Sequence, residues 1–329
     1  MQLTFLPSLR RVRRVRRSAI ATGWIVLACF VLAGSARAQS SDAKVSITPR
    51  ISTQLEAKAS RSGVIRADAN RVFISATVTD TYGRPVEGLR KQHFRLLEDG
   101  VEQEMSDFFI EDGPISIGVV LDVSASIRNK LAEAQQTIRE FLGFSQPGDE
   151  FFLVTFSDQP ELVHGFTTVP EGIEAEMAKI QPKGWTALYD AMVLAINHMK
   201  RASRSRRVLL VLTDGGDNNS RYSQSEVKTL IREANVRILS ISVQGHTPIL
   251  DKLAAESGGR AYQARKLEDL PEVAAAAGAE AHAQYVLGFN PATELRDGKY
   301  HTVKVEVVPP AADPGMHVSW RRGYYAPLQ

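Results

Sequence analysis

Three oxygen-bearing side chains follow a strongly apolar stretch in the first half of the chain. Residues 115–121 read ISIGVVL, and Asp122, Ser124 and Ser126 come directly after them. A continuous apolar run of this length is typical of a central strand in a parallel sheet that is covered on both faces. Alternate residues of an extended loop point to the same side, so the three oxygens can converge. Hard oxygen ligands of this kind indicate a small divalent cation.

Two further oxygen-bearing residues lie at comparable places later in the chain. Thr186 ends the loop at 182–186, and Asp214 follows an apolar strand predicted at 208–212. Because ligand sites in open α/β sheets form at the carboxyl ends of strands, we expect both residues at the sheet edge that carries Asp122. Two carboxylates would balance the charge of Mg²⁺ or Mn²⁺, and hydroxyls coordinate without adding negative charge. The predicted metal ligands are Asp122, Ser124, Ser126, Thr186 and Asp214.

The segments around these residues alternate between strand and helix patterns. The predicted strands are, in order, 115–121, 150–156, 162–166, 208–212 and 236–243, and the predicted helices are 127–144, 170–180, 187–201, 223–234, 250–257 and 267–281. Such alternation predicts an α/β domain with a doubly wound, mostly parallel sheet. Its predicted limits are residues 113 and 281.

Short β segments precede and follow the α/β pattern. Residues 71–79 and 302–307 alternate apolar and polar side chains, as half-buried antiparallel strands do, and further short strands are expected at 86–89, 93–98 and 105–110. Few strands alone make a marginal core. We therefore predict one small antiparallel β-sandwich built from residues 71–112 and 282–329, with the α/β domain inserted. Two separate β units are the alternative, and 39–70 is predicted to be a lead-in segment.

The N-terminus has the three-part pattern of an export signal. Six arginines lie between Arg10 and Arg17, an apolar run covers 19–33, and Ala-Arg-Ala precedes Gln39. We predict a signal peptide at 1–38 with cleavage after Ala38, which would place the protein in the periplasm or outside the cell. An uncleaved membrane anchor is the alternative, although the run is shorter than the roughly 17–25 residues that span a bilayer.

Removal of residues 1–38 changes the charge balance of the chain. This segment holds seven of the 40 lysines and arginines and none of the 37 acidic residues, so the remaining chain has a net charge of −4 with histidine neutral. A basic surface for nucleic acid is not indicated. The single cysteine, Cys29, leaves with the signal, so the exported protein would have no disulfide.

The spacing and order of the five predicted ligands resemble the metal-ion-dependent adhesion site of von Willebrand factor A domains. Residues 184–191, GWTALYDA, are similar to that family's threonine loop, and 212–215, LTDG, to its aspartate loop. The flanking segments, including 285–289 and 321–325, resemble an exported bacterial family called VWFA-related. Trp185 departs from the pattern, because glycine is more common there, and its ring would shape the rim of the site.

The resemblance implies a metal-dependent binding module and not an enzyme. In the family, the two serines coordinate the metal directly, while the threonine and aspartates exchange direct and water-mediated roles. An open metal position then accepts an acidic side chain from a protein partner. Two alternatives remain: a Mg²⁺-dependent hydrolase of the phosphatase type with Asp122 as nucleophile, and a purely structural envelope protein. Against the hydrolase, Ser124 stands where such phosphatases have a second aspartate.

Overall fold

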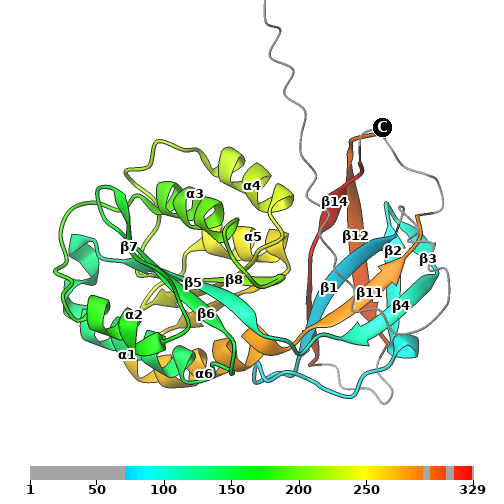
Figure 1. Ribbon diagram of the computed structural model, residues 1–329, viewed down its shortest axis with the longest axis horizontal. Helices are drawn as coiled ribbons and strands as arrows, with labels where there is room; N and C mark the ends of the chain where they lie inside the picture. The colour runs from blue at the N-terminus through cyan, green and yellow to red at the C-terminus, as the bar shows by residue number, and fades with distance from the viewer. Residues whose placement is uncertain (1–70, 292–296, 309–314, 328–329) are drawn as a thin grey trace, which may run out of the picture. The chain divides into compact units, whose positions relative to one another are not determined.

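The computed structural model describes residues 71–291, 297–308 and 315–327, all within one compact unit formed by residues 65–329 (Figure 1). The predicted signal peptide at 1–38 and lead-in at 39–70 lie outside the described residues. Within the described ranges, no helix combines the length and the apolar character needed to cross a membrane.

A six-stranded sheet forms the centre of the α/β domain. Its strand order is β10-β9-β8-β5-β6-β7, and every pair is parallel except β6 and β7. The strands are β5 (Ile115–Asp122), β6 (Glu150–Phe156), β7 (Pro160–Thr167), β8 (Arg206–Thr213), β9 (Arg237–Val243) and β10 (Arg260–Ala264). All eight residues of β5 are buried, as its apolar sequence predicts for a central strand.

Helices cover both faces of this sheet (Figure 1). One face carries α1 (Leu131–Leu142), α2 (Pro170–Met177) and α6 (Leu270–His282), and the other carries α3 (Leu188–Met199), α4 (Gln224–Glu233) and α5 (Pro248–Ser257). Alternate residues of β5 enter the two cores, because successive side chains of a strand point to opposite faces. Val119 packs with the first helix layer and Val120 with the second. The predicted doubly wound α/β fold is confirmed.

The segment after β5 differs from the prediction. A helix was expected from Ile127, but a 3₁₀ turn covers Ala125–Lys130 and α1 begins only at Leu131. Lys130 has φ −127° and ψ 1°, which is not a helical conformation. The tighter turn keeps the polar residues after β5 in a loop next to β8. The predicted helix start is therefore wrong, because apolar spacing continues through a segment that is not α-helical.

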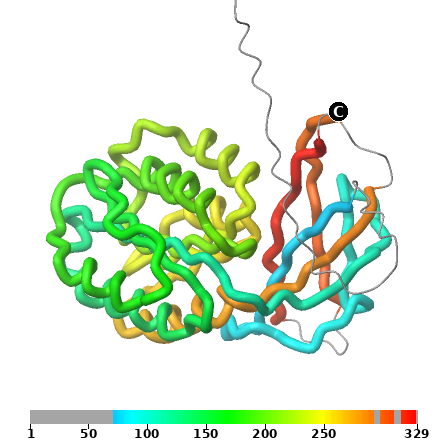
Figure 2. The backbone as a smooth tube through the Cα atoms, in the orientation of Figure 1, coloured from blue at the N-terminus to red at the C-terminus, as the bar shows by residue number. Residues whose placement is uncertain are grey.

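Two four-stranded antiparallel sheets form the β-sandwich. Their strand orders are β13-β1-β11-β4 and β14-β12-β2-β3. The strands are β1 (Val72–Thr79), β2 (Phe94–Glu98), β3 (Val101–Gln103), β4 (Met105–Ile110), β11 (Tyr285–Phe289), β12 (Tyr300–Val307), β13 (His317–Trp320) and β14 (Gly323–Tyr325). Each described sheet combines two strands from before the α/β domain with two from after it, and Figure 2 shows these blue and orange-red segments side by side. The domain boundaries stay a prediction.

One predicted strand is absent from the described sandwich. Residues 86–89 form no strand, and the Tyr285 hydroxyl holds them instead. This hydroxyl donates a hydrogen bond to the Val86 carbonyl at 2.8 Å and accepts one from the Leu89 amide at 3.2 Å. The strand prediction was wrong because the segment joins β1 through one backbone hydrogen bond, from the Val86 amide to the Val78 carbonyl at 2.8 Å, and the Tyr285 hydroxyl satisfies other backbone groups of 86–89.

Candidate metal centre

The site lies where neighbouring strands β5 and β8 end. The register pairs Leu121 with Leu212, so Asp122 ends β5 beside Thr213, and Asp214 follows immediately. From β5 the chain continues to β6 on one side of the sheet, whereas β8 leads to β9 and β10 on the other side. The gap between β5 and β8 is therefore the topological switch point, where open α/β sheets bind ligands.

The carboxylate of Asp122 is fully buried, and each of its oxygens accepts one hydrogen bond. Its Oδ1 accepts a hydrogen bond from the Ser124 amide at 2.8 Å, and its Oδ2 accepts one from the Thr213 hydroxyl at 2.5 Å. Burial raises the pKa of Asp122; hydrogen bonds from Thr213 and Ser124 oppose this shift, and the nearby charge of Asp214 adds to it. A cation at this place would favour the ionised form, since an opposite charge lowers the pKa of an acid.

A chain of hydrogen bonds connects the β5 loop to Asp214. The hydroxyls of Ser124 and Ser126 lie 3.0 Å apart, and the Ser126 hydroxyl donates to Asp214 Oδ1 at 2.7 Å. The other oxygen, Asp214 Oδ2, accepts a hydrogen bond from the Lys130 ammonium at 2.9 Å. The side chain of Asp214 is only 2% exposed. The structure thus brings three of the five predicted ligands into direct contact, and Asp122 lies two residues from the first of them.

The loop of Thr186 lies against the β5 loop. The Lys183 amide donates to the Val123 carbonyl at 2.9 Å, and the Ala125 amide donates to the Gly184 carbonyl at 3.0 Å. The Thr186 amide donates to Asn218 Oδ1 at 2.8 Å. In the described part of the chain, the hydroxyl of Thr186 has no hydrogen-bond partner. The loop is in the expected place, and the role of this residue as a ligand stays a prediction.

Gly184 and Asp158 fix the conformation of the threonine loop. Gly184 has a φ of +75°, and a Cβ atom there would lie 2.4 Å from Asp158 Oδ2, so a larger residue is excluded. Asp158 Oδ1 accepts a hydrogen bond from the Trp185 amide at 2.8 Å. The Trp185 side chain, at the position where this chain departs from the family pattern, is 65% exposed. A large ring therefore stands in solvent next to Thr186.

The side chains at this edge fit a hard divalent cation. They offer two carboxylates and several hydroxyls, which are ligands that Mg²⁺ and Mn²⁺ prefer. Among the residues that the structure describes, no group of three or more His, Cys, Asp or Glu side chains is placed to hold a metal, so the predicted set depends on its hydroxyls. The contact of Lys130 with Asp214 shows that this carboxylate already attracts a positive charge.

Sequence reasoning missed two residues of this cluster. Thr213 was treated only as part of the Leu-Thr-Asp-Gly loop, and Lys130 was placed inside a helix. The strand register pairs β5 with β8, so a hydroxyl at the end of β8 could have been assigned to Asp122 once the sheet order was known. Lys130 is 84 positions from Asp214 in the sequence, and no local pattern connects them.

The fold and the edge residues together define a doubly wound α/β domain with an oxygen-rich ligand site at the carboxyl ends of its strands. Residues 117–216 match the family model described as von Willebrand factor type A domain. The α/β domain of this chain is a von Willebrand factor type A domain. Domains of this family commonly bind a divalent metal and generally mediate contacts between proteins.

Several known proteins are similar to this chain. Inter-alpha-trypsin inhibitor heavy chain H4 from Sus scrofa is 27% identical over 164 residues, which cover 45% of this chain and 18% of that protein. An uncharacterized protein from Borreliella burgdorferi is 28% identical over 137 residues, which cover 39% of this chain and 40% of that protein. The chain therefore spans less than half of the length of either curated relative.

Solved structures overlap with this chain at lower identity. Proximal thread matrix protein 1 from the mussel byssus, in a form with a zinc-occupied MIDAS motif, is 21% identical with a TM-score of 0.48, covering 54% of this chain and 48% of that chain. BatB from Bacteroides thetaiotaomicron is 16% identical with a TM-score of 0.40, covering 48% of this chain and 96% of that chain.

Proposed function

We propose that this protein is an exported module that binds a protein partner through a divalent cation, Mg²⁺ or Mn²⁺. The residues proposed to hold the cation are Asp122, Ser124, Ser126, Thr186 and Asp214. The observation that carries this proposal is the hydrogen-bonded chain from Ser124 through Ser126 to Asp214, beside the buried Asp122. When bound, the cation supplies an electrophilic centre for an acidic side chain of the partner.

The charges at the site support an acidic partner. Two carboxylates, one lysine and a divalent cation together carry a net charge of +1, so an incoming carboxylate would be attracted. The exposed ring of Trp185 supports a contact with a macromolecule, because aromatic side chains are enriched where proteins bind each other. The partner we propose therefore presents an aspartate or glutamate on its surface.

The environment of Asp122 favours binding over catalysis. A nucleophilic carboxylate must approach a bulky phosphate ester directly, whereas Asp122 is fully buried; each of its oxygens accepts one hydrogen bond, and the remaining lone pairs can still face a small cation or its water. We therefore place the phosphatase-type hydrolase second. Phosphatase assays with Mg²⁺ distinguish the two, since turnover that is lost in Asp122→Asn would support the hydrolase.

The export of the protein is proposed from its first 38 residues. They contain the arginine-rich, apolar and small-residue segments of a signal peptide. Mass spectrometry of the N-terminus of protein isolated from the cell envelope or medium tests this point. A mature chain that begins at Gln39 supports export, and an intact N-terminus in the cytoplasm contradicts it.

Metal titration of Asp122 variants tests the proposed site. In calorimetric titrations with Mn²⁺, Asp122→Ala should lose at least about tenfold in affinity, because each charged ligand contributes more than the roughly 1.4 kcal/mol of a tenfold change. Asp122→Asn keeps the shape of the side chain and should lose a similar amount. Asp251→Ala removes a half-exposed carboxylate from α5 and should leave the affinity within about threefold of wild type.

Two outcomes contradict the proposal. Unchanged Mn²⁺ affinity in a folded Asp122 variant would remove this residue from the site. If envelope proteins are captured by the immobilised protein equally well in Mg²⁺ and in EDTA, binding does not depend on a metal, and the structural role becomes the better account. Circular dichroism of each variant establishes that its fold is intact.

A further inference from the structure

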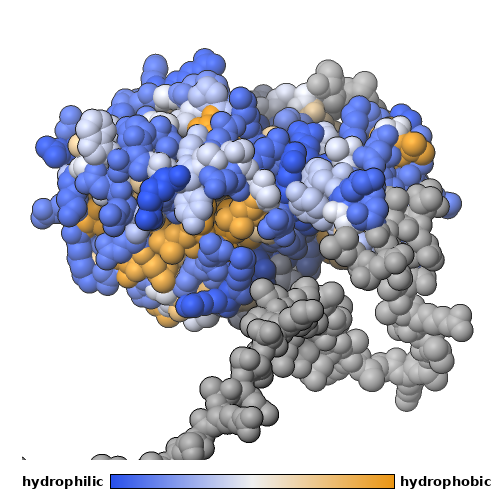
Figure 3. Space-filling view, turned by 90° about the horizontal axis from the view of Figure 1, so that it is seen from above, coloured by the Kyte–Doolittle hydropathy of each residue, from blue (hydrophilic) through white to orange (hydrophobic). Residues whose placement is uncertain are grey.

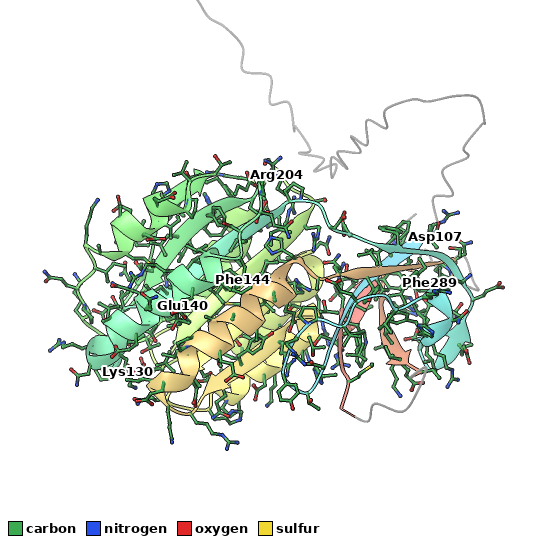
Figure 4. The ribbon with its side chains drawn as sticks, turned by 90° about the horizontal axis from the view of Figure 1, so that it is seen from below. Asp107, Lys130, Glu140, Phe144, Arg204 and Phe289 are labelled. Atoms are coloured by element: carbon green, nitrogen blue, oxygen red, sulfur yellow. The ribbon has the colours of Figure 1, made fainter. Side chains whose placement is uncertain are left out.

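We propose that Lys130 is an internal cation that competes with the metal for Asp214 and so sets the metal affinity of the site. This inference rests on the proposed function, because it concerns the same cluster. The Lys130 ammonium contacts Asp214 Oδ2 at 2.9 Å. Figure 4 shows Lys130 at the start of α1, at the opposite end of that helix from Phe144.

The surroundings of the pair make it a strong contact. The side chain of Lys130 is 22% exposed and that of Asp214 is 2% exposed. A carboxylate with so little contact with water is costly unless it has hydrogen bonds and an opposite charge. The Ser126 hydroxyl supplies one hydrogen bond to it, and Lys130 supplies the charge. Without a metal, Lys130 is therefore the group that neutralises Asp214.

Lys130 is the last residue of the 3₁₀ turn and directly precedes α1, where a cation is unfavourable for the helix. It is the N-cap residue of α1, and its side chain does not cap the helix. Serine, threonine, aspartate and asparagine are preferred there, and the positive end of the helix dipole repels a cation. The start of α1 thus gives no reason for a lysine at this position, although the end of the 3₁₀ turn tolerates one. The contact with Asp214, on the loop after β8, gives one.

The ion pair between Lys130 and Asp214 also opposes the binding of a metal ion. A divalent cation held by Asp122 and Asp214 would share the Asp214 carboxylate with the ammonium, and two positive charges at this separation repel each other strongly in a poorly hydrated place. Metal binding must therefore overcome either the loss of the ion pair or this repulsion. Both lower the affinity, so the lysine would leave the site without metal until the cation concentration is high.

Titrations of three variants with Mn²⁺ separate this role from a general effect of charge. Lys130→Gln removes the ammonium and should bind Mn²⁺ about ten- to a hundredfold more tightly than wild type. Lys130→Arg keeps the charge and should stay within about threefold. Arg128→Gln is the matched control, because Arg128 lies on the same 3₁₀ turn but donates to the Pro182 carbonyl at 3.4 Å and not to Asp214. It should also stay within about threefold.

Melting temperature in EDTA gives a readout that needs no metal. There Lys130→Gln should melt below wild type, because Asp214 loses its counter-charge, and saturating Mn²⁺ should raise its melting temperature more than that of wild type. If wild type binds Mn²⁺ and Lys130→Gln has the same affinity as Arg128→Gln, the role of Lys130 is refuted while the proposed function stands. If neither wild type nor Lys130→Gln binds Mn²⁺, both are refuted. Binding by Lys130→Gln alone supports both.

Discussion

The Thr213 hydroxyl fixes the orientation of Asp122, although only the aspartate is a predicted ligand. Thr213 is fully buried, and its hydroxyl donates to Asp122 Oδ2 at 2.5 Å and accepts a hydrogen bond from the Gly215 amide at 3.1 Å. A carboxylate placed in this way needs less reorganisation to meet a cation, because groups around a metal orient its ligands. The last residue of β5 and the last residue of β8 therefore act together.

We expect Thr213→Val to destabilise the metal-free protein by about 1–3 kcal/mol. The substitution keeps the shape of the side chain but leaves one oxygen of a buried carboxylate and one amide without a partner. Urea unfolding in EDTA measures the change. Thr229→Val is the matched control, since Thr229 is exposed on α4 and should change stability by less than about 0.5 kcal/mol. Equal stability of the two variants would contradict the role assigned to Thr213.

The residue types at the site were more predictable than their contacts. Asp122, Ser124 and Ser126 follow an apolar run, and Asp214 follows another, so the rule about strand ends predicts one edge for all four. The ion pair between Lys130 and Asp214 was not predictable, because a lysine near a helix start carries no information about a loop 84 residues away. Pairs of this kind depend on the sheet order and on the 3₁₀ turn that displaces the helix.

At the level of elements, strong apolar periodicity predicted where strands and helices lie. Side-chain contacts decided whether the weaker segments form strands or loops. The run at 115–121 became β5 nearly as expected, because eight buried residues leave no other arrangement. The segment at 86–89 was predicted as a short strand, yet it is a loop whose Val86 carbonyl and Leu89 amide bond to the Tyr285 hydroxyl. The β3 strand was missed, since Val101–Gln103 is too short to show a period.

A histidine joins β12 to the turn between β2 and β3. His301 is 8% exposed, and its Nδ1 lies 2.8 Å from Asp99 Oδ2, while its Nε2 lies 3.3 Å from Asp297 Oδ1. Burial alone would lower the pKa of His301, but the hydrogen bonds and charges of Asp99 and Asp297 outweigh it, so the pKa is raised. The pKa of Asp99 is lowered because the hydrogen bonds from His301 and Thr302 outweigh its desolvation.

These pKa shifts predict that His301 contributes to the stability of the folded protein in a pH-dependent way. A histidine whose pKa is raised in the folded protein stabilises the fold at pH values below its unfolded-state pKa, about 6.5. This stabilisation is lost as the pH rises through the pKa of the folded state. His301→Gln should therefore cost about 1–2 kcal/mol at about pH 5.5 and clearly less at about pH 8.5. Urea unfolding at both pH values measures it. A cost that does not fall with rising pH contradicts the charged pair.

His246→Gln is the control for this experiment. His246 Nε2 lies 3.3 Å from Asp251 Oδ2, and both side chains are at least half exposed. An exposed pair of this kind contributes little, so we expect a change below about 0.5 kcal/mol at both pH values.

For the whole molecule, the sandwich and the site belong to different parts of the described chain. Strands from both ends of the described residues build the sandwich core, which includes Ile74, Leu96, Leu287 and Val305. The cluster around Asp122 instead depends on the inserted α/β domain. Hydrophilic residues dominate the face drawn in Figure 3, with hydrophobic residues gathered in patches.

The most direct test of the central claim is to locate Mn²⁺ by anomalous diffraction in crystals grown with the metal. We predict one strong anomalous peak among the side-chain oxygens of Asp122, Ser124, Ser126 and Asp214, with the Thr186 loop beside it. The peak should be absent from crystals of Asp122→Asn. No peak at these oxygens in wild-type crystals grown with millimolar Mn²⁺, or a peak only at other carboxylates, would contradict the account.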